Sequence, residues 1–262
     1  MKRGHRLALL LCMLMPVFAQ AGNYRCVSLD YPPLIYKDSD NRVKGLAVDI
    51  VSAVFKSMGH TIDVEIYPWA RSLEMLRTGE RDCIFTIFHS PEREQFLDFS
   101  AEAILPQVVY FYTKKDAPIV FNGDIASLAG WRIGTVRKIS YGQRFDDMRA
   151  KLKLDEAYEL EQSMKKLLIG RIDLFPSNYY SASHLLKLPR NKEWADKIVQ
   201  LPVAIDVVPS YLAFAKSKKM TSLRDSFDQE FRNFLATGQY RDLLIKYQLE
   251  NSPELIRFLQ NR

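Results

Sequence analysis

One arginine in this chain lies directly after an apolar run. The run at 84–88 predicts a buried strand, and Pro91 ends it. Arg93 therefore lies where a strand gives way to a loop or helix, which is where α/β proteins bind ligands. A planar guanidinium can hold a carboxylate through two parallel hydrogen bonds, so this position predicts an anion site. The alternative is a surface arginine paired with Glu92 or Glu94.

The N-terminus has the three parts of a secretory signal. Basic residues occur in the first six positions, an apolar run covers 7–18, and a small-x-small site ends at Ala21. We expect cleavage after Ala21 and export, because the apolar run is too short to span a bilayer comfortably. Cleavage would remove three of the 37 Lys and Arg and none of the 31 Asp and Glu. The small positive excess that remains does not indicate a nucleic-acid partner.

Two cysteines remain in the mature chain, Cys26 and Cys83, each near the beginning of a predicted strand. An oxidising compartment permits a disulfide, and the side chains can meet if the strands are parallel neighbours. Two buried free thiols are the alternative. The sequence has no Cys-x-x-Cys, and His60, His89 and His184 are scattered. We therefore predict no metal site and no cofactor.

Strands alternate with amphipathic helices along the chain. The first unit consists of predicted strands at 24–29, 61–67 and 83–88, with helices at 47–58 and 70–76 between them. This order implies a parallel sheet covered by helices. The alternation starts again within 128–175, and a strand at 210–216 and an amphipathic helix at 222–237 follow. Two α/β units are therefore expected.

Several short motifs together resemble a known family. In chain order they are Tyr31-Pro32-Pro33-Leu34, Val43-Lys44-Gly45-Leu46 with Asp49, Pro91-Glu92-Arg93 with Asp98-Phe99-Ser100, Leu128-Ala129-Gly130, Ser140-Tyr141-Gly142 and Gly238-Gln239-Tyr240. Their order and spacing resemble the periplasmic solute-binding proteins of family 3, which include amino-acid receptors of ABC importers. The element Pro68-Trp69-Ala70-Arg71 further resembles a branch in which Pro-Trp-x-Arg follows the second strand.

The resemblance implies a type II periplasmic binding fold. Two α/β lobes, each a mainly parallel sheet with flanking helices, would be joined by two crossover strands. We expect the signal peptide at 1–21, lobe one at 22–112 and 210–262, and lobe two at 113–209. Such lobes close around a ligand by hinge bending. The resemblance also implies a monomer in the periplasm that works with an ABC permease or a membrane receptor.

The resemblance assigns roles to several residues of the cleft. Arg93 matches the residue that holds the ligand's α-carboxylate, and Tyr31 matches an aromatic that stacks on the ligand, although it can instead pack under its loop. Ser140 and Tyr141 lie at a predicted helix start, where backbone amides would add a second anion contact. Ser140 can equally be an ordinary N-cap.

Four further positions bear on specificity. Trp69 and Arg71 follow the second strand at the ligand-facing edge, with a core tryptophan and a solvated arginine as the alternatives. Phe88 replaces a small hydroxyl residue that often helps to bind the carboxylate, and Asn178 replaces the aspartate that pairs with the α-ammonium. An asparagine cannot neutralise a buried ammonium. We therefore hypothesise a small carboxylate ligand, aromatic or otherwise apolar, within the wider class of amino acids and related organic acids. The aromatic residues expected to flank this ligand are Tyr31, Trp69, Phe88 and Tyr141.

Two other functions compete with solute binding. The same fold resembles exported cyclohexadienyl dehydratases, which act on carboxylated rings with a general acid, and Glu92 and His89 are the candidate acids. No Ser-His-Asp, metal or phosphate-loop constellation occurs in the sequence. We predict a binding protein without catalytic activity. A lyase and a sensory input protein are the alternatives.

Overall fold

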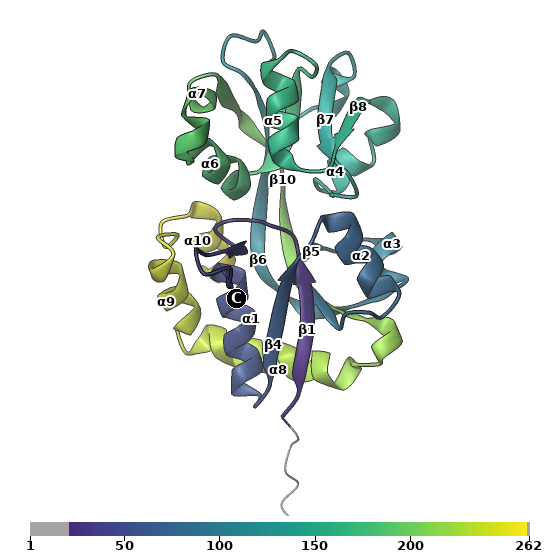
Figure 1. Cartoon of the computed structure of the whole chain (residues 1–262), viewed down its shortest axis with the longest axis vertical. Coiled ribbons are helices and arrows are strands. Elements are labelled where there is room, and N and C mark those ends of the chain that lie inside the picture. Colours follow the sequence, from purple (N-terminus) through teal and green to yellow (C-terminus); the bar gives the residue numbers. More distant parts are fainter. Residues whose placement is uncertain (1–20, 261–262) are drawn as a thin grey trace, which may run out of the picture.

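The computed structural model describes residues 21–260, so the predicted signal peptide, except for Ala21, lies outside the described part. Figure 1 shows two lobes joined by two long strands, β6 (Leu97–Lys114) and β10 (Ile198–Ala215). Among the described residues, no helix is long and apolar enough to cross a membrane.

One eight-stranded sheet runs through both lobes in the order β4-β1-β5-β10-β6-β9-β7-β8. Within each lobe the other strands pair in parallel, β1 with β4 and β5, and β7 with β8 and β9. The antiparallel pairs of the eight-stranded sheet all involve β6 or β10. The remaining strands of this sheet are β1 (Asn23–Ser28), β4 (Thr61–Ile66), β5 (Cys83–Phe88), β7 (Arg132–Val136), β8 (Lys153–Ala157) and β9 (Leu174–Asn178); β2 (Tyr36–Lys37) and β3 (Val43–Lys44) form a separate hairpin. The fold is therefore α/β with a mainly parallel sheet.

Helices surround both halves of this sheet (Figure 1). Lobe one carries α1 (Leu46–Ser57), α2 (Trp69–Arg77), α3 (Pro91–Glu94), α8 (Thr221–Ala236), α9 (Gln239–Lys246), α10 (Pro253–Gln260) and the 3-10 turn η4 (Lys216–Lys218). Lobe two carries α4 (Gln143–Asp146), α5 (Leu160–Leu168), α6 (Tyr179–Lys187), α7 (Lys192–Ala195) and the 3-10 turns η1 (Ile125–Leu128), η2 (Arg149–Lys151) and η3 (Pro189–Asn191).

Successive residues of β1 pack on opposite faces of the sheet, as the period of two requires. Cys26 belongs to a core with Phe55 of α1 and Phe227 of α8. Its neighbour Val27 belongs to a second core with Leu76 of α2. The lobe-one sheet is therefore buried on both faces, which explains why every residue of β5 is buried and all but Thr86 are apolar.

Two prolines face each other where the crossover strands pass between the lobes. Pro106 of β6 lies opposite Pro209 of β10, and because neither has an N–H, they occupy a non-hydrogen-bonded pair of this ladder. On β10, pairing with lobe one starts at Ser210, and on β6, pairing with lobe two starts at Val109. The facing prolines thus lie next to the first pairings with each lobe, and the expected lobe boundaries at 112/113 and 209/210 stay predictions.

Cys26 and Cys83 form a disulfide between the parallel neighbours β1 and β5, where they are paired in register. Both residues are fully buried. The bridge joins two strands that are 57 residues apart in the chain. It therefore fixes the centre of the lobe-one sheet, whose carboxyl ends lead into the loops of the interlobe face.

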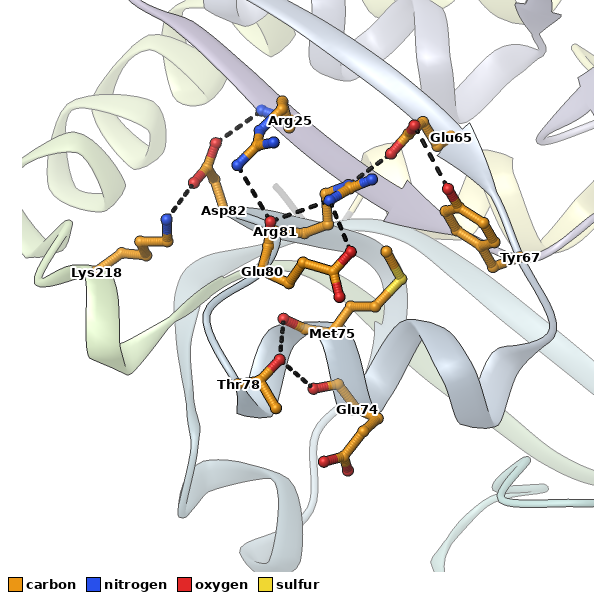
Figure 2. Close-up of polar contacts among 10 residues, drawn as sticks. All are labelled: Arg25, Glu65, Tyr67, Glu74, Met75, Thr78, Glu80, Arg81, Asp82 and Lys218. Carbon is orange, nitrogen blue, oxygen red and sulfur yellow. Dashed lines mark hydrogen bonds and ion pairs between the residues drawn. The ribbon is translucent and has the colours of Figure 1, made fainter.

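Polar contacts hold the amino-terminal end of the same strands (Figure 2). Asp82 accepts a hydrogen bond of 2.8 Å from the Arg25 amide and forms an ion pair of 3.3 Å with Lys218. Arg81 pairs with Glu65 at 2.5 Å, which ties in β4. Charged pairs thus tie the start of β5 to β1, to β4 and to the turn that contains Lys218.

Removing the disulfide tests its contribution to the lobe. We expect Cys26→Ala/Cys83→Ala to lower the free energy of unfolding by about 2–4 kcal/mol, because the unfolded chain regains the freedom of a long loop. Urea denaturation followed by circular dichroism measures the change. Wild-type protein unfolded in reductant should match the double variant. Equal stability of oxidised wild type and double variant would contradict this role.

Candidate functional site

A cleft of about 660 Å³ lies between the lobes. Its walls come from the carboxyl ends of β1, β4 and β5 in lobe one and of β7, β8 and β9 in lobe two. This is the edge at which α/β sheets bind ligands. The residues expected from the sequence that line it are Tyr31, Trp69, Phe88, Arg93, Ser140, Tyr141 and Asn178. Arg71 is not among the lining residues.

Arg93 carries a buried charge into this cleft. The side chain is only 6% exposed, and it donates to the Phe88 carbonyl at 2.7 Å and to the Lys138 carbonyl at 3.3 Å. Burial lowers its pKa to about 10, with Asp146 and Glu92 acting only as more distant charges. Within the described residues no carboxylate forms an ion pair with it. The guanidinium thus stays charged at neutral pH and lacks an anionic partner.

Trp69 also donates a hydrogen bond to the Lys138 carbonyl. Its indole Nε1 donates to the Lys138 carbonyl at 3.1 Å, and the Arg93 guanidinium lies 5.6 Å from the centre of its ring. Lys138 belongs to lobe two and has a φ of 61°, which residues other than glycine rarely adopt. The Lys138 carbonyl of lobe two, at a position with a strained backbone, therefore accepts two hydrogen bonds from lobe one.

A polar network forms part of the cleft wall. The Tyr31 hydroxyl donates to Gln107 Oε1 at 2.5 Å, and Asn178 Nδ2 donates to the same oxygen at 3.3 Å. Gln107 Nε2 in turn donates to the Thr86 carbonyl at 3.1 Å, while Asn178 Oδ1 accepts from the Tyr180 amide at 2.7 Å. Asn178 is thereby the N-cap of α6. Tyr31 thus both lines the cleft and is anchored beneath its loop.

Ser140 and Tyr141 lie in the loop before α4, whose N-cap is Gly142 and not Ser140. The Ser140 hydroxyl donates to the Asp146 carboxylate, which also accepts from the Tyr141 amide at 3.4 Å. The Tyr141 hydroxyl accepts from the Val136 amide at 2.8 Å, and burial raises its pKa. Both side chains are therefore held by their own lobe, and contact with a ligand remains a prediction.

Phe88 and Arg71 lie in different environments. Phe88 ends β5, is buried, and supplies both an apolar wall and a carbonyl for Arg93. Arg71 is exposed, and its guanidinium lies 4.6 Å above the ring of Tyr67. The structure places it outside the cleft lining, so it does not support the ligand role that the sequence suggested.

Several residues that line the cleft were not predicted from the sequence. Gln107 and Thr86 belong to apolar stretches, and a lone amide inside such a strand was the available signal. Asp30, Glu159 and His184 line the cleft as well. Desolvation raises the pKa of Asp30, an effect that nearby His184 partly offsets, and desolvation lowers the pKa of His184. The cleft therefore also has a titratable region contributed by both lobes.

The two candidate acids lie outside this cleft. His89 pairs with Glu94 at 2.9 Å, and its ring centre lies 4.7 Å from that of Phe99. It lines a separate cavity of about 480 Å³ on lobe one. Glu92 is exposed and does not line the interlobe cleft. Neither residue is positioned to protonate a ligand held between the lobes.

The model of the bacterial extracellular solute-binding proteins, family 3, matches residues 25–250. The chain belongs to this family. Among similar solved structures is the substrate-binding protein of an amino-acid ABC transporter, with 21% identity, a TM-score of 0.71 and coverage of 87% of this chain and 99% of that one. An arginine third transport system periplasmic binding protein from Legionella pneumophila has 16% identity, a TM-score of 0.73 and coverage of 87% and 100%.

A histidine kinase sensor domain with similarity to periplasmic binding proteins matches equally well in fold. It has 18% identity, a TM-score of 0.75 and coverage of 87% of this chain and 96% of that one. At identities this low, the likeness establishes the type II periplasmic binding fold alone. This family 3 protein thus shares its fold with receptors of importers and with a sensor.

Replacing Trp69 tests the contact between the lobes. Trp69→Phe keeps an aromatic ring but removes the N–H that Lys138 accepts, so we expect the closed arrangement to lose about 1 kcal/mol. Fluorescence energy transfer between labels on the two lobes, measured without ligand, should show a roughly fivefold lower closed-to-open ratio. Trp194→Phe, in lobe two and outside the cleft lining, is the control. An unchanged ratio in Trp69→Phe would show that the Trp69–Lys138 hydrogen bond does not stabilise the closed arrangement.

Proposed function

We propose that this family 3 protein captures a small carboxylate-bearing solute between its lobes and presents it to an ABC-type permease or a membrane receptor. The observation that carries the proposal is the buried Arg93 guanidinium, which has carbonyl partners and no ion pair within the described residues. A desolvated charge of this kind favours an incoming counter-ion. The N–H donors that Arg93 does not give to carbonyls match a carboxylate.

The cleft wall supports an apolar body behind that carboxylate. Phe88, Trp69, Tyr31 and Tyr141 line the cleft and are each less than one-tenth exposed. Aromatic side chains of this kind bury ligand surface while polar groups set its orientation. A small organic acid with an apolar or aromatic body fits this combination of one cationic anchor and several rings.

Neither acid expected from the sequence, His89 or Glu92, lines the cleft, which supports binding over catalysis, and the lyase alternative then depends on Asp30, Glu159 or His184. Incubating the purified protein with prephenate and with arogenate, followed by mass spectrometry, tests the lyase alternative directly. We expect both compounds to be recovered unchanged. Sensing remains an alternative mode of the same capture, since a sensor domain is among the proteins of similar fold.

Changing Arg93 tests the anchor. We expect Arg93→Met to weaken binding of the co-purified acid, identified by native mass spectrometry, by at least about 2 kcal/mol, or roughly thirtyfold. Arg93→Lys should recover part of this loss, because the charge returns without the planar fork. Isothermal titration calorimetry measures both variants.

Arg77→Met is the matched control for this experiment. Arg77 also stacks on an aromatic ring, with its guanidinium 4.3 Å from the ring centre of Phe96, but it does not line the cleft. Its loss should leave affinity within about twofold of wild type. Equal affinities of wild type and Arg93→Met for the native acid would refute the proposed anchor.

A further inference from the structure

The orientation of the Gln107 amide is dictated by its neighbours. The Thr86 carbonyl can only accept, so the Gln107 atom 3.1 Å from it is the NH₂ group. The other amide atom is therefore the oxygen, which faces Tyr31 and Asn178. Asn178 is oriented independently, because the Tyr180 amide can only donate and must face Asn178 Oδ1. The two assignments agree, since Asn178 then presents its NH₂ to Gln107.

The amide oxygens of Gln107 and Asn178 therefore accept hydrogen bonds from the protein itself. Gln107 Oε1 receives two hydrogen bonds, which fills both lone pairs of an amide oxygen. Asn178 Oδ1 caps α6. Each NH₂ group of these two residues makes one hydrogen bond to protein and has a second hydrogen. Among the described residues, no carboxylate hydrogen-bonds to Gln107, Asn178 or Tyr31.

The backbone at Thr86 holds this arrangement in place. Thr86 has a φ of 60°, an outlier for a β-branched residue, and the register between β5 and β10 shifts beside it. Thr86 is skipped in the pairing of these strands, so its carbonyl is free for Gln107. Gln107, Thr86 and Asn178 are each less than one-tenth exposed. Strain at a buried polar network that lines a cleft indicates a built site.

We infer that Gln107 and Asn178 make this cleft selective for acids that carry a second oxygen acceptor, 2-oxo or 2-hydroxy acids, and against 2-amino acids. The inference rests on the proposed function, in which Arg93 holds the carboxylate. A keto or hydroxyl oxygen can accept from the spare N–H groups. An ammonium beside these two amides meets N–H donors and no direct counter-ion, because the carboxylates that line the cleft, among them Asp30 and Glu159, make no hydrogen bond to Gln107 or Asn178.

A panel of matched acids tests this selectivity. Calorimetry would compare, for methyl, isobutyl and benzyl side chains, the 2-oxo, 2-hydroxy and 2-amino acids and the acid without a 2-substituent. We expect the oxo or hydroxy acid of at least one series to bind about tenfold more tightly than its amino and unsubstituted partners. Equal binding across every series, lost in Arg93→Met, overturns this inference and leaves the proposed function standing. Failure of every acid to bind overturns both.

Two variants separate a specificity role from a structural one. Gln107→Glu and Asn178→Asp each replace an NH₂ group, with its spare N–H and the one network hydrogen bond that it donates, by a carboxylate oxygen. Aspartate remains a good N-cap for α6. We expect each to bind the oxo acid about tenfold more weakly and the amino acid no more weakly than wild type does. Gln200→Glu makes the same charge change at an exposed residue of β10, outside the cleft lining, and should alter neither. Parallel losses for oxo and amino acids, in variants whose circular dichroism matches wild type, would overturn the inference.

Discussion

The buried charge of Arg93 is the constraint on which the cleft depends. A guanidinium at this depth needs acceptors, and it finds one carbonyl in each lobe, Phe88 in lobe one and Lys138 in lobe two. Separating the lobes removes the second acceptor and returns the charge to water. An anion that binds the remaining N–H donors offsets the cost of burial in the closed state. Charge burial and lobe closure are therefore coupled through a single side chain.

Gln107 belongs both to the stretch of β6 that passes between the lobes and to the polar network of the cleft wall. Gln107 directly follows Pro106, which faces Pro209 where the two strands pass between lobes. Gln107 also joins Tyr31 of lobe one to Asn178 of lobe two. If the lobes rotate about this stretch, as the hinge bending of periplasmic binding proteins predicts, the rotation would rearrange hydrogen bonds within the cleft wall.

Periodicity and punctuation predicted β1, α1, β4, α2, β5 and α8 to within one residue at each end, because each depends on local patterns such as the stripe that buries Phe227 and Phe231 in α8. The long crossover strands were not predicted at their full length, because 210–216 covers only the end of β10. Arg93 was also predictable, since a strand end followed by Pro-Glu-Arg is a local signal. The Lys138 carbonyl was not, because every residue has a carbonyl and only the tertiary arrangement selects one. Trp69 lines the cleft and Arg71 does not, because residues two apart on the helix α2 point to different faces.

The amide of Asn178 is explained by its contacts and not by its cap. Aspartate caps a helix as well as asparagine does, so α6 alone leaves the choice between them open. Gln107 Oε1 removes that freedom, because the atom 3.3 Å from it must be a donor, and an aspartate would set two acceptors against each other. Gln107 cannot turn its amide over to relieve the conflict without facing its oxygen to the Thr86 carbonyl. The Thr86 carbonyl therefore fixes the orientation of the Gln107 amide, and Gln107 Oε1 in turn requires an NH₂ group at position 178 of lobe two.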